Sequence, residues 1–251
     1  MLGFSSIVKN ADYRESAMSF TPPVSNTDLA YLNLFERGQA GLTTNWAKGM
    51  PKGAVTGAPV IHDRSALFRY KQNYIDTLVP QAYEMQFVAL AKSARTLETP
   101  RVGREFILSN YLSNGPDGGS EGFSIYFDNQ TDTSYSIAIS LRTTSGVQQR
   151  SFGIPITGKP VLVMGGYSSA TRKIRLVCGT SKLEFDFPKA SDKVIRGGTI
   201  QLGTIGERTG SPGTVELEVF LAGVWQRKFT KEEEDTFTAY GDFYLNRVGR
   251  T

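Results

Sequence analysis

Residues 215–240 read VELEVFLAGVWQRKFTKEEEDTFTAY, and the expected fold follows largely from this stretch. Its first half is rich in β-branched and aromatic residues, which is typical of a strand. In its second half Thr230 is a favoured N-cap, and Glu233 follows three residues later as in a capping box. Acidic residues crowd the first turn, where the helix dipole favours them. We therefore expect a last strand and then a helix of about two to three turns, with Phe237 and Tyr240 packed on the protein body.

The chain before this stretch consists of short runs with strand character. In one of them Leu183, Phe185 and Phe187 alternate with polar residues and so share one face. Glycine pairs such as Gly165-Gly166 are read as turns between the runs. Regular short strands with almost no helix predict an all-β sandwich or barrel. The predicted strands are 65–71, 74–79, 85–93, 104–112, 122–129, 134–144, 148–156, 159–168, 172–180, 182–188, 198–205 and 214–225.

Composition excludes several classes of protein. The chain has 251 residues, enough for one large β domain, and a formal net charge of +4. Lysines and arginines are spread along the chain without a long run, so we expect no nucleic-acid partner. The N-terminal residues have no long apolar stretch, so we expect no secretory signal and no membrane insertion. The single cysteine, Cys178, cannot form an intramolecular disulfide, so stability must come from the core.

The first residues differ from the rest of the chain. Residues 1–24 show no sustained hydrophobic period, and Pro22 and Pro23 favour an extended path. We expect an anchoring arm over residues 1–24, with Phe4, Pro22 and Pro23, and one domain over residues 25–251. The arm docks either on its own domain or on neighbouring subunits, and we favour the neighbours. Residues 29–38, LAYLNLFERG, fit either a helix or a strand by their pattern.

Several motifs, in their order along the chain, resemble those of one fold family. The phrase WQRKFT at 225–230 and the acidic helix after it resemble the closing motif of concanavalin A-like and laminin-G-like jelly rolls, with Phe229 where leucine is usual. Residues 45–49 (NWAKG) and 55–60 (VTGAPV) are similar to the front end of lectin-like domains in bacteriophage and prophage virion proteins. Residues 74–77 and 85–88 look like the strands that follow there, and 200–203 like a later strand with its glycine.

This resemblance covers about residues 29–245 and implies a two-sheet antiparallel jelly-roll sandwich of the concanavalin A-like type. The extended N-terminal arm and one short C-terminal helix complete the expected fold. Residues 29–38 then become a strand rather than a helix. The helix is expected to cover the open end of the jelly roll. Trp225 is expected in the core rather than in a ligand platform.

Catalytic chemistry finds little support in the sequence. His62 would need Asp63 or Ser65 as a partner, but neighbouring residues of a strand point to opposite faces. Cys178 is interpreted as a small buried residue rather than a nucleophile. One histidine and one cysteine exclude the usual zinc sites. We therefore expect no catalytic residue.

Paired carboxylates are the remaining catalytic signal. Glu184 and Asp186 share a strand face, as in glycosidases of this fold, but Pro188 stands where the enzymes' third carboxylate is expected. An ordinary amphipathic strand explains the same pattern. Glu216 and Glu218 alternate likewise and are interpreted as a solvated face.

Binding sites have weak candidates only. Calcium is the one cofactor considered, and its candidate ligands are loop residues that also fit ordinary turns: Asp117, Asp128, Asn129 and Asp132. Carbohydrate binding needs aromatic side chains with polar neighbours. The candidates are strand or loop tyrosines that also fit as sheet fillers: Tyr111, Tyr126, Tyr135 and Tyr167.

Three functions compete at this point. The resemblance favours a non-enzymatic bacteriophage virion structural protein, tail-associated or capsid-decorating, that is assembled in the host cytoplasm. Its expected partners are other virion proteins, copies of itself and a host-surface glycan. A stand-alone carbohydrate-binding receptor module and a glycan-degrading hydrolase are the alternatives. Fold alone does not separate them, because one fold serves many functions.

Overall fold

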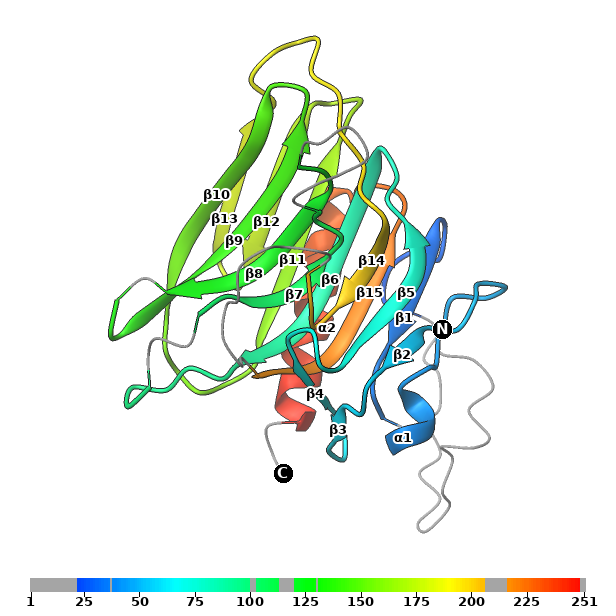
Figure 1. Ribbon diagram of the computed structural model, residues 1–251, viewed down its shortest axis with the longest axis vertical. Helices are drawn as coiled ribbons and strands as arrows, with labels where there is room; N and C mark the ends of the chain where they lie inside the picture. The colour runs from blue at the N-terminus through cyan, green and yellow to red at the C-terminus, as the bar shows by residue number, and fades with distance from the viewer. Residues whose placement is uncertain are drawn as a thin grey trace.

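The protein is an antiparallel two-sheet sandwich with one long C-terminal helix (Figure 1). The structure, a computed structural model, describes residues 22–36, 38–99, 103–112, 120–129, 131–205 and 216–248. Figure 1 shows one sheet in front of the other, with the helix behind both. The expected all-β jelly-roll sandwich is confirmed.

The rear sheet has eight strands. They are β1 (Leu29–Asn33), β3 (Val60–Ile61), β4 (Ala66–Arg69), β6 (Glu84–Ser93), β11 (Val161–Ser168), β12 (Lys173–Cys178), β13 (Ser181–Asp186) and β15 (Glu216–Trp225). Their order is β13-β12-β11-β6-β15-β4-β3, and β1 also pairs with β15. The segment 29–38 thus begins as the expected strand, and the single-turn α1 (Gly38–Gly41) follows it.

The front sheet has seven strands. They are β2 (Ala54–Thr56), β5 (Tyr74–Pro80), β7 (Glu105–Ser109), β8 (Phe123–Asn129), β9 (Ser134–Thr143), β10 (Gly146–Pro155) and β14 (Thr199–Leu202). Their order is β10-β9-β8-β7-β14-β5-β2. Each predicted strand from residue 65 onward overlaps one of the strands observed in the two sheets.

The main core lies between the two sheets and follows from period-two alternation. Along β8, Phe123 and Ile125 point inward, and the residues between them face outward. The rings of Phe87 and Phe123 stack across the sandwich with centroids 3.9 Å apart. Cys178 is buried in this core, and burial raises the pKa of its thiol to about 12. The interpretation of Cys178 as a small buried residue is confirmed.

The glycine pair at 165–166 is not a turn, contrary to the expectation. Both residues lie inside β11 and pair with β6 on one side and β12 on the other. A Cβ atom at Gly165 would meet Ile125 Cδ1 at 2.5 Å. Gly165 therefore permits close contact between the two sheets. The prediction of a turn here was wrong, because the missing side chain serves packing at this position.

The residues just before β1 are packed on the domain. Pro22 is buried, Pro23 is half-buried, and Val24 joins the cluster around Trp225. Trp225 is 0% exposed, as expected, and its Nε1 donates to the carbonyl of Ser25 at 3.1 Å. The last part of the predicted arm thus contacts its own domain. Residues 1–21, including the predicted anchor Phe4, lie outside the described residues.

The C-terminal helix α2 (Lys231–Val248) is longer than expected and lies elsewhere. It has 18 residues and covers the outer face of the eight-stranded sheet, where Phe237 and Tyr244 join a second hydrophobic cluster. The expectation that it covers an open end of the jelly roll is wrong, because that sheet has an apolar outer face to bury. Gly241 lies against β11, where a Cβ atom would meet Leu162 Cδ2 at 2.5 Å.

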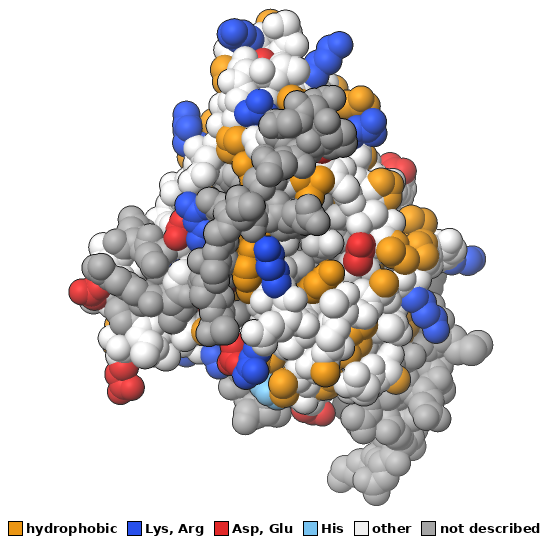
Figure 2. Space-filling view, in the orientation of Figure 1, with side chains coloured by type: hydrophobic (Ala, Val, Ile, Leu, Met, Phe, Trp, Pro, Cys, Tyr) orange, Lys and Arg blue, Asp and Glu red, His pale blue; other side chains and the backbone are white. Residues whose placement is uncertain are grey.

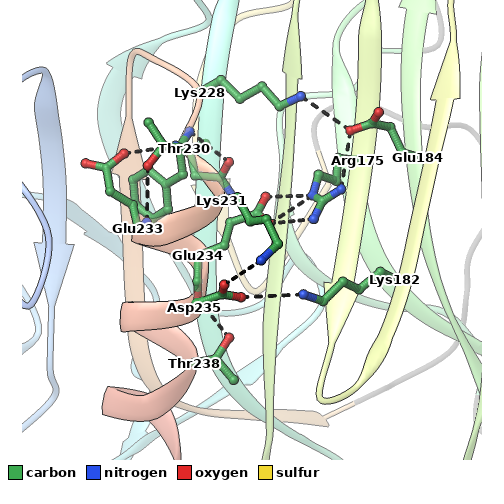
Figure 3. Close-up of polar contacts among 12 residues, drawn as sticks. Arg175, Lys182, Glu184, Lys228, Thr230, Lys231, Glu233, Glu234, Asp235 and Thr238 are labelled. Carbon is green, nitrogen blue, oxygen red and sulfur yellow. Dashed lines mark hydrogen bonds and ion pairs between the residues drawn. The ribbon is translucent and has the colours of Figure 1, made fainter.

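The predicted capping box is present at the start of α2 (Figure 3). The Glu233 amide donates to Thr230 Oγ1 at 3.2 Å, and the Thr230 amide donates to Glu233 Oε2 at 3.0 Å. Arg175 on β12 donates to both carboxylate oxygens of Glu234 at 2.6 to 2.9 Å. Charged hydrogen bonds of this kind hold the first turn of the helix against the sheet.

Candidate functional site

A row of polar side chains crosses the outer face of the seven-stranded sheet. Directly paired residues of antiparallel strands share a face, so the register alone builds this row. The paired residues run across β14, β7, β8, β9 and β10, and we name them the polar row: Gln201, Ser109, Ser124, Ser140 and Gln149. The hydroxyl oxygens of Ser109 and Ser124 are 2.7 Å apart, so these two members of the row share a hydrogen bond.

A cavity of about 270 Å³ opens over the β8 to β10 part of this row. Ser124, Ser140 and Gln149 line it together with two of the predicted tyrosines, Tyr111 and Tyr126. Tyr126 is 2% exposed and forms part of the floor, whereas Tyr111 is half-buried and Gln149 is exposed at the rim. The cavity therefore joins an aromatic wall to hydroxyl and amide groups, as ligand pockets commonly do.

One cation stands at the edge of this cavity. Arg104 Nε donates to Asp128 Oδ2 at 2.9 Å, and its guanidinium lies 5.2 Å from the centre of the Tyr126 ring. The Arg104 side chain is 34% exposed, so it can also reach a ligand. Figure 2 shows this side of the molecule, where hydrophobic side chains lie among basic ones.

The other two candidate tyrosines do not face this cavity. Tyr135 and Tyr167 are 2% and 0% exposed and lie in the core between the sheets. The Tyr167 hydroxyl donates to the carbonyl of Ala82 at 2.9 Å and accepts from Gln81 at 2.8 Å. Burial raises the pKa of Tyr135 to about 12. The prediction that these two tyrosines contact a ligand is wrong, because they point inward on β9 and β11.

His62 and Ser65 do meet, because a turn and not a strand connects them. Ser65 Oγ lies 3.4 Å from His62 Nδ1 and donates to Glu218 Oε1 at 2.6 Å. The same His62 Nδ1 lies 2.9 Å from that carboxylate oxygen. A catalytic triad places the serine and the carboxylate on opposite ring nitrogens, so this arrangement does not activate Ser65.

The sequence predicted that Glu218 belongs to a solvated face, and this prediction is wrong. Its side chain is 15% exposed and is surrounded by Ser65, His62 and Lys92. Burial alone would raise the pKa of its carboxyl, but hydrogen bonds from Ser65 and His62 and the charge of Lys92 hold that pKa below its ordinary value. Glu216, in contrast, pairs with Arg69 at the surface.

The carboxylate pair on β13 belongs to an ion-pair network. Lys173 Nζ lies 3.0 Å from Glu184 and 3.3 Å from Asp186, and Arg175 lies 3.3 Å from Glu184. Burial would raise the pKa of Glu184, but its cationic neighbours hold it below the ordinary value. A glycosidase acid needs a raised pKa, so Glu184 lacks the electrostatics of that role.

The calcium candidates gain no support from the described residues. Asp128 is engaged by Arg104, Asp132 is exposed, and Asp117 lies outside the described residues, as does the side chain of Asn129. Within the described parts of the chain no three His, Cys, Asp or Glu residues group as metal ligands would. Among those same residues no helix has the length and apolarity to cross a membrane.

The sequence predicted the two tyrosines of the cavity but not its polar residues. The register between strands cannot be read from one sequence, so four lining residues were not predicted: Arg104, Ser124, Ser140 and Gln149. A partial signal existed in residues 134–141, SYSIAISL, where small residues alternate with large apolar ones. Such alternation predicts one outward face of small, mostly hydroxyl-bearing side chains.

Comparison with known proteins establishes the fold only. No protein-family model and no curated protein sequence matches the chain. Among solved structures, the binding domain of botulinum neurotoxin DC in complex with rat synaptotagmin II has a TM-score of 0.62, 7% identity, and covers 86% of this chain and 52% of that chain. The serotype D binding domain has a TM-score of 0.61, 11% identity and coverages of 85% and 52%.

The chain shares the fold of part of these domains. A third neighbour, the serotype D ligand binding domain in complex with N-acetylneuraminic acid, has a TM-score of 0.60 and 10% identity, and covers 86% of this chain and 51% of that chain. The chain thus spans about half the length of these neighbours. Identities this low carry no ligand or partner across to this chain.

Proposed function

We propose that the chain is a non-enzymatic carbohydrate-binding module and that it binds a glycan in the cavity over the polar row. The cavity with Tyr111 beside Ser124, Ser140 and Gln149 is the observation that carries this proposal. A sugar presents an apolar ring face and a rim of hydroxyl groups. Tyr111 offers an aromatic surface to the first, and serine and glutamine offer both donors and acceptors to the second.

The neighbours in fold support the same class of function without settling it. One of them is a complex with N-acetylneuraminic acid, and that sugar is bound by that protein. The electrostatics of Glu184 and Asp186 agree with a module that binds and does not cleave. The proposed binding requires no cofactor, so chelation of calcium is expected to leave it unchanged.

We further propose that this module belongs to a bacteriophage virion, on the tail or the capsid exterior. The support is the motifs at 45–49 and 55–60, which resemble the front end of virion lectin-like domains, followed in order by the jelly-roll closing motif at 225–230. Its partners would be other virion proteins, copies of itself through residues 1–21, and a glycan of the host surface. Assembly would take place in the cytoplasm of the bacterial host.

A glycan-array screen with the purified chain tests the binding proposal. Tyr111→Ala is expected to weaken binding to the best glycan about tenfold, because it removes one aromatic contact. Gln149→Ala is expected to weaken it as well. Tyr83→Ala is the matched control, since Tyr83 is 52% exposed and does not line the cavity. Equal losses in Tyr111→Ala and Tyr83→Ala, or no bound glycan, would contradict the proposal.

A further inference from the structure

A second cavity, of about 380 Å³, lies on the other sheet and is separate from the polar row. Its walls are the turn 62–65 between β3 and β4, the turn 158–160 between β10 and β11, and residues of β6 and β15. Glu218 and Lys92 are directly paired, so both face the outer side of the eight-stranded sheet. The volume falls within the roughly 300–1,000 Å³ of small-molecule sites.

The charged groups around this cavity are mostly paired with one another. His62 and Lys92 contact Glu218 at 2.9 and 3.5 Å, and Arg64 contacts Asp63 at 3.6 Å. Lys159 differs from them: across the described residues it takes part in no ion pair, and it is exposed at the cavity wall. It is therefore a cation that lines the cavity with no carboxylate of the described part of the chain to neutralise it.

The charge balance of the cavity is positive. Three permanent cations face two carboxylates, so the lining carries one net positive charge with His62 neutral and two with His62 protonated. Ser65 and His62 both contact Glu218 Oε1, and Lys92 Nζ lies 3.5 Å from Oε2, so the protein's own groups surround this carboxylate. Phe220 and Pro160 add apolar surface to the lining.

We propose that this cavity binds a small organic carboxylate, whose anionic group lies between Lys159, Arg64 and His62 and whose body rests on Phe220 and Pro160. This site is independent of the glycan cavity and of the virion role. Cations that line a pocket with low-dielectric walls attract an anion more strongly than cations on open surface do.

Glucuronate and glucose form a matched pair of probes, since they share a ring and differ in the carboxylate. The full chain, labelled with ¹⁵N, is titrated with each at low salt while amide shifts are recorded. Glucuronate is expected to shift the amides of Ser65 and Glu218, and glucose is not. Equal shifts with both sugars, or no shifts at millimolar glucuronate, would overturn the proposal.

Charge variants separate this site from general attraction. Lys159→Gln is expected to weaken glucuronate about fivefold, the effect of one exposed charge pair. Lys52→Gln, an exposed lysine outside the cavity, is expected to change nothing. Tyr111→Ala should leave glucuronate binding intact. Equal losses of glucuronate affinity in Lys159→Gln and Lys52→Gln would show nonspecific electrostatic attraction instead of a binding site.

Discussion

Arg95 and Glu105 form a fully buried ion pair beside the core. Both side chains are 0% exposed, and Glu105 also accepts from the Ser93 hydroxyl and from the Ala94 amide at 2.6 Å. Burial lowers the pKa of Arg95 to about 10, which still leaves it charged at neutral pH. Each partner thus compensates a charge that the interior could not otherwise hold.

Glu105→Gln is expected to destabilise the protein by about 3–5 kcal/mol, because it leaves the Arg95 charge buried without a counterion. Urea unfolding monitored by tryptophan fluorescence measures the change. Arg104→Gln is the matched control at a half-exposed pair with Asp128, and it should cost less than about 1 kcal/mol. A cost of Glu105→Gln as small as that of the control would contradict the buried-pair account.

At the residue scale the sequence separated the tyrosines poorly. Tyr126 and Tyr135 both lie in predicted strands, yet one faces outward and the other inward. Their faces follow from the alternation in each strand: Phe123, Ile125 and Phe127 in β8 fix Tyr126 outward. The alternation could be read from the sequence. Which of the two faces packs against the core could not, because that depends on how the strands pair.

The element best predicted is the start of α2. The contribution of its N-cap to the free energy of unfolding can be measured. Thr230→Ala removes the hydroxyl that accepts from the Glu233 amide and is expected to cost about 1 kcal/mol of unfolding free energy. Thr230→Ser keeps the acceptor and is expected to cost only a few tenths of that. Urea denaturation of both variants provides the comparison, and equal costs would argue against the capping role.

Glu233 also makes the stability of α2 depend on pH. The hydrogen bond from Arg227, outweighing burial, holds the pKa of Glu233 below its ordinary value of 4.5. A carboxyl pKa lowered by folding stabilises the protein above that ordinary value, and the contribution is lost as the pH falls through the folded pKa. Glu233→Gln should therefore be less stable than the unmodified protein near neutral pH.

The difference between the two proteins should shrink as the pH falls from neutral toward ~3, because protonation of Glu233 removes the negative partner of Arg227 in the folded state. Urea midpoints at several pH values measure it. Asp242→Asn, at an exposed acid of the same helix, is the control variant. A constant gap between Glu233→Gln and the unmodified protein down to that pH would contradict the linkage.

The start of α2 could be predicted from the sequence, but its position on the sheet could not. The helix continues through Gly241, a poor helix former, beyond the two to three turns that the sequence predicted. Its place on the outer face depends on an apolar surface made by β6, β11 and β15 together. Three strands distant in sequence create that surface, so no local pattern announces it.

At the scale of the whole molecule, residues 1–21 are proposed to join copies of the chain. Removal of these residues should leave a folded monomer, because the packed residues Pro22 and Val24 stay in place. The full-length protein should be a trimer or larger, and light scattering gives both masses. Removal of residues 1–24 is the comparison, since it also strips Val24 from the Trp225 cluster and should lower stability. Monomers in every case would exclude assembly through this arm.

The central claim is that the cavity over the polar row binds a glycan. Amide chemical-shift mapping with the best glycan from the array tests it most directly. The account predicts that the largest shifts fall on β8, β9 and β10, around Ser124, Ser140 and Gln149, and that Tyr111→Ala removes them. Shifts confined to other surfaces of the molecule, with Ser124, Ser140 and Gln149 unchanged, would contradict it.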